Sequence, residues 1–324
     1  MIDSIQIETG SRVHFGLLRT EAPFGGLGMM VQSPTTRVSV SPSRDFEIEQ
    51  AFTKRLQAIG KRMTDHFALG ASQLDKKGLP KARLRVLQSA PAHHGLGSGT
   101  QLSLAAADAL TRFYDIECDQ STLAYQIAGR GRRSAIGAHG YFTGGMIYEA
   151  CAQDNQTGRA ENQTLNQVRW QIDVPTPWRI VLVRPHQQAP VIHGKQETQH
   201  FQNITQQQAA QELQHIAEKR ILPALQTKDF ASFAEAIEAF NHTSGMMYQS
   251  VQGGPYNGQA VTALVQDVKA IVGSGVGQSS WGPTVFAWCE NETQAKRLAE
   301  QLTRQGRQPQ ITAALNRGRV IADE

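Results

Sequence analysis

The chain has 324 residues, of which 40% are hydrophobic and 19% are charged. This is the composition of a folded globular protein, and it excludes a disordered chain of low hydrophobicity and high charge. The formal net charge of +4 comes from 32 basic and 28 acidic residues without a long basic stripe, so we expect no nucleic-acid partner.

Strands dominate the predicted elements at the start of the chain, where apolar and polar residues alternate. The expected strands lie at residues 5–7, 13–17, 38–40, 46–48, 84–87 and 146–148. Helical spacing is seen at residues 53–69, 102–110 and 123–128. Residues 152–167 are polar, and we expect a surface excursion there.

The second half of the chain continues the interleaving of strands and helices. Strands are predicted at residues 180–183, 285–288 and 310–313, and helices at 206–225, 230–240, 260–272 and 292–305. This order argues for an α+β protein built in layers. The length suggests two domains, which we place at residues 1–170 and 171–324.

Neither an export signal nor a membrane span is evident. Residues 1–10 lack a positively charged segment followed by an apolar run, and about 18 consecutive apolar residues never occur. The three cysteines lie far apart without C-x-x-C spacing, which argues against a disulfide framework or a zinc site. We therefore expect a cytoplasmic protein without a membrane partner.

The sharpest functional signal is the glycine-rich turn at residues 91–101, which joins a predicted strand to a helix. Small residues let backbone N–H groups approach an anion, and a helix N-terminus carries about half a positive charge. The predicted phosphate-binding residues are Gly95, Leu96, Gly97, Ser98, Gly99, Thr100 and Gln101. Ser98 and Thr100 are also candidate Mg²⁺ ligands. The alternative is a tight turn in which one of these two hydroxyls caps the helix.

Three arginines stand within four positions of a glycine-framed segment at residues 129–133. Arg130 and Arg133 are predicted to clamp a phosphate through forked hydrogen bonds. Arg132 is expected to point away. The alternative is a solvated helix face.

The candidate catalytic residues are Arg12, His14 and His139. Arg12 and His14 are two positions apart on a predicted strand, so their side chains should share a face. Arg12 would then be placed to hold a substrate carboxylate. His14 could donate a hydrogen bond or move a proton, or could be a satisfied core histidine. His139 follows the arginine segment closely.

The glycine-rich turn resembles the central motif of the GHMP kinase superfamily, Pro-x-x-x-Gly-Leu-Gly-Ser-Ser/Gly-x. Residues 10–17 resemble the first motif of that superfamily, and residues 273–277 with 282–284 resemble its third. The resemblance implies a two-domain α+β fold, with an N-terminal domain like ribosomal protein S5 and a ferredoxin-like C-terminal domain.

Within that superfamily the chain is similar to the β-ribofuranosylaminobenzene 5′-phosphate synthases over nearly its whole length. The stretches that carry this similarity are residues 11–18, 24–28, 95–101, 129–145 and 278–284. The resemblance implies a further set of substrate-binding residues in the third motif, namely Gly275, Gly277, Gln278, Ser279, Ser280 and Trp281. Trp281 could instead be core packing.

The activity implied by this resemblance is a decarboxylating phosphoribosyl transfer in tetrahydromethanopterin biosynthesis. The substrates would be phosphoribosyl pyrophosphate and 4-aminobenzoate or 4-hydroxybenzoate, and CO₂ and pyrophosphate would be released. We expect Mg²⁺, no organic cofactor and a homodimer.

Two other functions stay open from the sequence, a GHMP-type ATP-dependent small-molecule kinase and a non-catalytic module that binds a phosphorylated ligand. Many kinases of the superfamily carry a Ser-Gly-x-Asp pattern whose aspartate accepts the proton of the substrate alcohol. The comparable stretch here is Ser134-Ala135-Ile136-Gly137, without an aspartate. This departure weakens the kinase hypothesis.

Overall fold

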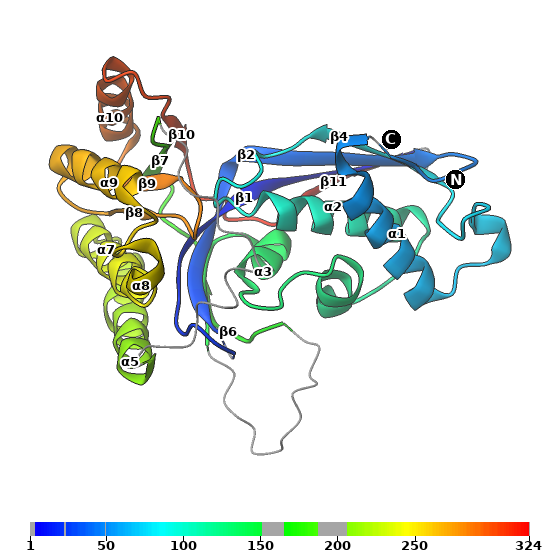
Figure 1. The fold of residues 1–324 in the computed structure, drawn as a ribbon, viewed down its shortest axis with the longest axis horizontal. Coiled ribbons are helices and arrows are strands. Elements are labelled where there is room, and N and C mark those ends of the chain that lie inside the picture. Colours follow the sequence, from blue (N-terminus) through cyan, green and yellow to red (C-terminus); the bar gives the residue numbers. More distant parts are fainter. Residues whose placement is uncertain (1–3, 23, 49, 151–164, 187–205, 324) are drawn as a thin grey trace.

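The structure is a computed structural model that describes residues 4–22, 24–48, 50–150, 165–186 and 206–323. Most of the surface excursion predicted at residues 152–167 lies outside these ranges. The described strands form two sheets, and helices cover them in layers (Figure 1). The mixed α+β architecture predicted from the sequence is confirmed. Among the described residues, the helices are all too short or too polar to cross a bilayer.

The first sheet has the strand order β11-β1-β2-β4-β3, and β5 and β6 continue it beside β2. Its strands are β1 (Ile5–Leu17), β2 (Gly26–Pro42), β3 (Glu47–Ile48), β4 (Ala82–Gln88), β5 (Met146–Glu149), β6 (Val168–Ile172) and β11 (Val320–Asp323). The helices packed on this sheet are α1 (Thr53–Phe67), α2 (Ser98–Phe113) and α3 (Ile136–Thr143), joined by short 3₁₀ turns at Gln50–Phe52 and Ala71–Gln73 and a π-helical turn at Thr122–Ile127.

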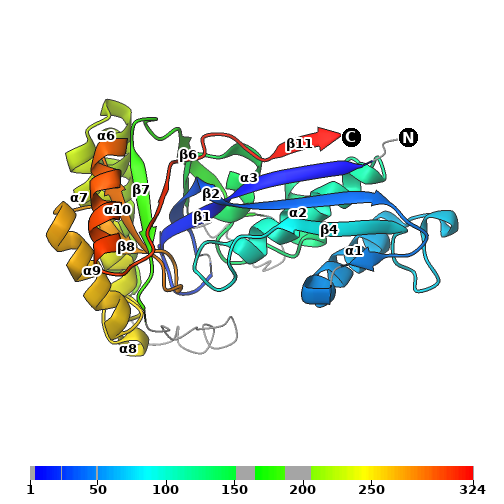
Figure 2. The ribbon, with the colours of Figure 1, turned by 90° about the horizontal axis from the view of Figure 1, so that it is seen from above.

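The second sheet has the order β10-β7-β9-β8. Its strands are β7 (Arg179–Val183), β8 (Val276–Gln278), β9 (Val285–Cys289) and β10 (Gln310–Thr312). Its helices are α5 (Gln206–Ile216), α6 (Leu222–Thr227), α7 (Phe230–Met246), α8 (Gln249–Gln252), α9 (Gln259–Val272) and α10 (Glu292–Arg304), with a π-helical turn at Ala217–Ile221 between α5 and α6. This layered unit stands at one end of the long β1–β2 ladder (Figure 2).

Both faces of the second sheet are buried, as the continuous apolar run in β7 indicates. Ile180 and Leu182 lie in the core shared with α5, α6 and α7. Val181 and Val183 lie in a separate core with α9 and α10. Successive side chains of a strand point to opposite faces, so a single five-residue strand serves two hydrophobic cores.

Strand β1 changes sides part-way along its length, and this positions the site. Ile5 and Ile7 pack in the core beneath α1 and α2. The pairing with β2 is irregular between Thr9 and Ser11, and beyond it the odd-numbered Val13 and Phe15 join the core of the second unit. An interruption of this kind re-aims side chains. The even-numbered residues then face α2 and α3.

Two strands bear on the domain division proposed at residue 170. Strand β6 ends two residues beyond it, at Ile172, and β11 at the end of the chain pairs with β1 in the first sheet. The chain therefore leaves the first unit and returns to it. The core that includes Phe15 and Phe286, whose rings meet edge to face at 5.1 Å, joins the two units.

Candidate functional site

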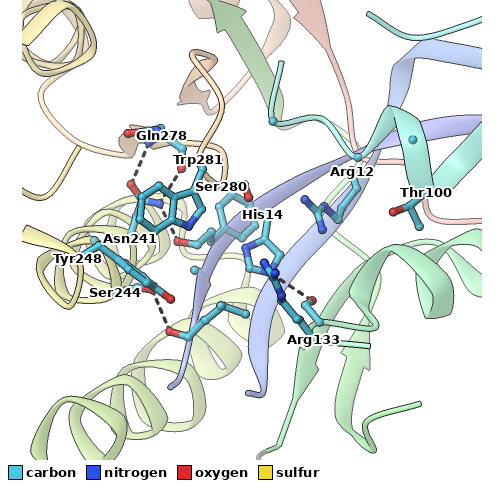
Figure 3. A pocket seen from close by; sticks show the side chains of 18 of the residues that line it. Arg12, His14, Thr100, Arg133, Asn241, Ser244, Tyr248, Gln278, Ser280 and Trp281 are labelled. Carbon is cyan, nitrogen blue, oxygen red and sulfur yellow. Dashed lines mark hydrogen bonds between the residues drawn. The ribbon is translucent and has the colours of Figure 1, made fainter. Parts of the chain in front are cut away.

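A cavity of about 520 Å³ lies where the two units meet, and five segments distant in the sequence line it (Figure 3). They are the end of β1, the glycine-rich turn with the start of α2, the arginine segment, the end of α7 with the following turn, and the loop after β8. Twelve of the predicted site residues line it, namely Arg12, His14, Gly95, Gly97, Ser98, Gly99, Thr100, Arg130, Arg133, Gln278, Ser280 and Trp281.

The glycine-rich turn presents the N-terminus of α2 to this cavity. Helix α2 begins at Ser98, four residues before the predicted start, because Gly97 takes a left-handed conformation at φ 69° immediately before it. Glycine adopts this conformation without steric cost. The N–H groups of the first turn of a helix have no partner within the helix, and here this turn faces the pocket. The geometry is that of an anion site.

Arginines supply the charge of the pocket. Arg130 donates from Nε and Nη2 to the hydroxyl of Ser103 at 3.2 and 3.1 Å, which holds it against the second turn of α2. Burial, together with the charges of Arg55 and Arg62, lowers the pKa of Arg130 to about 10, so it remains a cation at neutral pH. Among the described residues that line the pocket, none is an aspartate or a glutamate.

Arg12 and His14 are carried into the pocket by β1. Arg12 packs on the helix start, since a Cβ added to Gly97 would lie 3.2 Å from the Arg12 Cβ. Burial lowers the pKa of Arg12 to about 10, and the charge of Glu149 opposes that shift. Burial and the charge of Arg12 hold the pKa of His14 well below 6.5, so its imidazole is neutral at physiological pH.

The far side of the pocket is aromatic. The rings of Trp281 and Tyr248 meet edge to face, with centroids 4.7 Å apart. In the view of Figure 3 this pair lies on one side of the pocket, Arg12 and Thr100 lie on the other, and His14 and Arg133 stand between them. Burial raises the pKa of Tyr248, and the nearby charge of Arg133 lowers it. A flat aromatic ligand with a negative group suits this end.

The loop at residues 278–282 is fastened to both neighbouring segments. The Ser279 hydroxyl donates to the Gly95 carbonyl at 2.8 Å. The N–H of His14 donates to the Ser279 Oγ at 3.1 Å, and the N–H of Ser280 donates to the His14 carbonyl at 3.0 Å. Ser279 was predicted to bind substrate, but these bonds bury it completely. Its position makes it a structural link between the glycine loops of the two units.

A second link runs through Asn241 in α7. Its amide donates to the carbonyls of Phe15 and Gln278 at 2.6 and 2.8 Å, and its Oδ1 accepts from the Gln278 N–H at 2.9 Å. Gln278 lines the pocket, yet its side chain is bonded to the N–H of Asn257 and the carbonyl of Gly282. These contacts hold the end of β1 and the end of β8 against α7 beside the pocket.

Three predicted residues from the first unit do not line the pocket. Leu96 is buried in the core. Gln101 is completely buried, accepts from the Thr9 hydroxyl at 2.9 Å and donates to the Gly137 carbonyl at 2.8 Å. The His139 Nε2–H donates to the Asn166 carbonyl at 2.8 Å. The placement of His139 therefore gives no support for its predicted catalytic role.

Gly275 and Gly277 also lie outside the pocket lining. A Cβ on Gly277 would stand 2.2 Å from the Asn241 Oδ1, and one on Gly275 would stand 3.1 Å from the Trp288 Cβ. Both glycines permit α7 to approach β8 closely. Their position in the third motif serves packing and gives no support for the predicted substrate contact.

Several lining residues were not predicted, among them Ser134, Asn241, Ser244 and Tyr248. Arg132, which was expected to point away, also lines the pocket, and its guanidinium lies over the Tyr125 ring. Of the four polar residues named first, Ser134 precedes α3. The last three come from α7 and the turn after it, where polar residues at helical spacing carry no motif. Ser244 donates to the Leu17 carbonyl at 2.8 Å. Ser134 lies in the stretch that resembles the synthases at residues 129–145, but no motif singles out its hydroxyl.

The lining residues do not form a metal site by themselves. Mg²⁺ in proteins is held by one or two carboxylates together with substrate phosphates. The described pocket lining offers the hydroxyls of Ser98 and Thr100 without a carboxylate, and no cluster of three acidic, histidine or cysteine residues occurs among the described residues. A site built by the protein alone is therefore not indicated.

Comparison with known protein families decides the fold. The N-terminal domain of the GHMP kinases matches residues 61–146, and their C-terminal domain matches residues 221–308. The chain has the GHMP kinase fold. Phosphomevalonate kinase of Streptococcus pneumoniae superimposes with a TM-score of 0.69 at 14% identity, covering 96% of this chain and 99% of that one. Mevalonate diphosphate decarboxylase of Enterococcus faecalis gives 0.67 at 14% identity, over 100% of both chains.

Curated relatives point to one branch of this fold. The β-ribofuranosylphenol 5′-phosphate synthase of Methanocaldococcus jannaschii is 26% identical over 302 residues, which is 87% of this chain and 88% of that protein. The protein of the same name from Methanothermobacter thermautotrophicus is 25% identical over 308 residues, or 89% of each chain. This GHMP-fold chain is thus similar to synthases over most of its length.

Proposed function

We propose that this protein is a decarboxylating phosphoribosyltransferase that joins phosphoribosyl pyrophosphate to 4-hydroxybenzoate or 4-aminobenzoate. The observation that carries the proposal is the division of the pocket, with arginines and a helix N-terminus at one end and the Trp281–Tyr248 pair at the other. A ligand pair made of a phosphorylated sugar and an aromatic acid matches both ends. The names of the relatives, which describe a ribosylated phenol 5′-phosphate, support the same reading.

The pyrophosphate is assigned to the start of α2 and to Arg130. Negative charge grows on the leaving pyrophosphate as the bond to the sugar breaks, and preorganised N–H groups and arginines stabilise it there. Arg12 packs on Gly97, so it is also assigned to the phosphate end. Arg133 lies close enough to Tyr248 for its charge to act on the phenol group. We therefore assign the substrate carboxylate to Arg133 in place of Arg12, for which it was predicted from the sequence.

The aromatic acceptor reacts through the ring carbon that bears its carboxylate. That carbon forms a bond to the anomeric carbon while the bond to pyrophosphate breaks, and loss of CO₂ then returns its bonding electrons to the ring. The amino or hydroxyl group opposite supplies the electron density. Enclosing both reactants in one pocket replaces a collision in water by an oriented encounter. Mg²⁺ would arrive bound to the pyrophosphate and form part of the substrate.

The test uses each acid labelled with ¹⁴C at its carboxyl carbon, incubated with the protein, phosphoribosyl pyrophosphate and Mg²⁺. We expect release of labelled CO₂ that requires phosphoribosyl pyrophosphate. A parallel assay with ATP and sugar or polyol alcohols measures nucleotide consumption. Alcohol-dependent ATP consumption without CO₂ release would replace the proposal with a kinase. Thermal stabilisation by phosphoribosyl pyrophosphate without turnover would indicate a binding module.

A further inference from the structure

A carboxyl group lies buried behind the pocket wall without lining it. Glu149 ends β5 and is completely inaccessible to solvent. Its Oε2 accepts from the Asn166 amide at 3.2 Å, while its Oε1 has no hydrogen bond of regular geometry within the described part of the chain. Burying a carboxyl group in its charged form is costly even where hydrogen bonds offset part of the cost. The reaction described above assigns no role to Glu149, although it lies directly behind the pocket wall.

Ser134 stands between this carboxyl group and His14. The Ser134 Oγ lies 3.2 Å from the His14 Nε2, and the same hydroxyl interacts with the Glu149 carboxyl and lowers its pKa. The Ile136 N–H donates to this Oγ at 3.3 Å. A hydroxyl has one proton and two acceptor positions. With Ile136 occupying one acceptor position, Ser134 either donates to Glu149 and accepts from His14, or accepts from Glu149 and donates to His14.

We propose that His14, Ser134 and Glu149 form a proton relay that removes the hydroxyl proton of a phenolic acceptor in the pocket. His14 lines the pocket, and Ser134 is the hydrogen-bond partner that the described residues provide for its ring. The proton arrives at Nδ1 of His14. The proton on Nε2 passes to the Ser134 oxygen, and the proton that Ser134 held passes to Glu149. One proton moves from substrate to Glu149, and His14 stays neutral with its tautomer reversed.

The order of basicity along the relay favours this direction. Burial and the charge of Arg12 prevent His14 from keeping a second proton, because they hold its pKa well below 6.5. Burial raises the pKa of Glu149 to about 8, against opposing contributions from Asn166, Ala135, Arg12 and Ser134. The carboxylate is therefore the stronger base of the two. Arg12 on β1 is the charged group that acts on both His14 and Glu149. His139 on α3 donates to the Asn166 carbonyl and reaches Glu149 only through Asn166.

The relay should affect the reactions of the two candidate acceptors differently. This expectation rests on the proposed function. A phenol becomes a much better electron donor to its ring when it loses its proton, and the product phenol regains that proton after CO₂ has left. A neutral arylamine already donates its lone pair and needs no base. The relay therefore acts on the phenolic acid, whose ribosylated product the names of the relatives describe, and is idle with the arylamine. Glu149 and Ser134 are positioning residues in this scheme, because each acts through His14.

The activity test compares Ser134→Ala and Glu149→Gln on both acids. General base catalysis contributes about 10²–10⁴-fold, so we expect kcat for 4-hydroxybenzoate to fall at least 100-fold while kcat for 4-aminobenzoate changes less than about threefold. KM should change little. Thr111→Val, which removes a buried hydroxyl bonded to the Asp108 carbonyl elsewhere on α2, is the matched control. Equal losses on both acids would overturn the relay.

A second measurement needs no turnover. Nitrogen-15 NMR of the histidine rings reports the tautomer of His14, assigned with a His14→Gln variant. Below the pKa of Glu149, Ser134 should donate to Nε2 and leave the proton on Nδ1; above it the proton should lie on Nε2. Glu149→Gln should abolish this pH dependence. A tautomer that is constant from pH 6.5 to 9.5 in the wild-type protein would overturn the relay. If the tautomer changes with pH but the protein releases no CO₂ from either acid, the relay stands and the proposed function is wrong.

Discussion

The backbone of Gly282, in the loop after β8, lies directly against the backbone of Gly95, in the turn before α2. A Cβ on Gly282 would stand 2.2 Å from the Gly95 nitrogen, and one on Gly95 would stand 2.2 Å from the Ser279 carbonyl oxygen. The turn before α2 and the loop after β8 therefore form one close backbone contact between the two units, which we call the joint. Both segments line the pocket, so this close approach of the two units shapes it.

Gly282→Ala should destabilise the protein and widen the joint. Its Cβ would meet backbone atoms on a segment that cannot move without breaking the Ser279–Gly95 hydrogen bond. We expect a loss of about 2–3 kcal/mol in the free energy of unfolding, measured by urea titration. Gly70→Ala is the control, because a Cβ there meets nothing nearer than 3.6 Å. Similar free energies of unfolding for the two variants would contradict the close backbone contact between Gly282 and Gly95.

Arg130→Met should weaken the binding of phosphoribosyl pyrophosphate by about 10–100-fold, because a charge-assisted hydrogen bond contributes about 1.5–3 kcal/mol. Isothermal titration calorimetry measures this directly. Ser103→Ala should show a smaller loss in the same direction, since Ser103 only holds the guanidinium. Arg304→Met, at the exposed end of α10, controls for the lost charge. Unchanged affinity in Arg130→Met would place the phosphate elsewhere.

Trp281→Leu should raise KM for the aromatic acid by about tenfold, because it removes ring contact area and an edge-to-face partner. The thermal shift produced by phosphoribosyl pyrophosphate should stay close to that of the wild-type protein. Trp170→Leu removes a tryptophan that packs on Tyr148, away from the pocket lining, and should leave KM unchanged. If Trp281→Leu instead lowered affinity for the sugar phosphate alone, the two ends of the pocket would be reversed.

Glu149→Gln should change how stability depends on pH. The pKa of Glu149 is raised from 4.5 to about 8 by burial. The folded state therefore holds a proton that the unfolded chain releases, and its contribution to stability is lost progressively from pH 4.5 to 8. The free energy of unfolding of the variant, relative to that of the wild-type protein, should rise by a few kcal/mol between pH 4.5 and 8. Below and above that interval the difference between the two proteins should not change with pH. Urea unfolding at pH 5, 6.5, 8 and 9 measures the difference, with Glu290→Gln at an exposed position as control. A difference independent of pH would show that Glu149 ionises normally.

Local pattern was enough to predict most elements of this fold. The alternation at Val13 and Phe15 identified the end of β1, and the apolar spacing at residues 53–69 identified α1 within two residues. Helix α3 was missed, because its Gly137 and Gly140 break a short segment whose apolar residues face all directions. These are short-range properties of the chain, which local sequence largely determines.

The sequence by itself determined the fold class and the position of the glycine-rich turn before α2, because glycine conformation, helix starts and strand alternation depend on near neighbours. Only the tertiary structure decided which residues meet. It separated Ser279 and Gly277, which pack, from Tyr248 and Ser134, which line the pocket, and it brought Glu149 behind His14. Contacts between residues more than a hundred positions apart arise from the packing of distant segments, within the first unit for His14 and Ser134 and between the two units for Ser279 and Gly95. The periodicity of apolar residues along the chain reports which face of an element is buried, and it does not report which distant residue packs there.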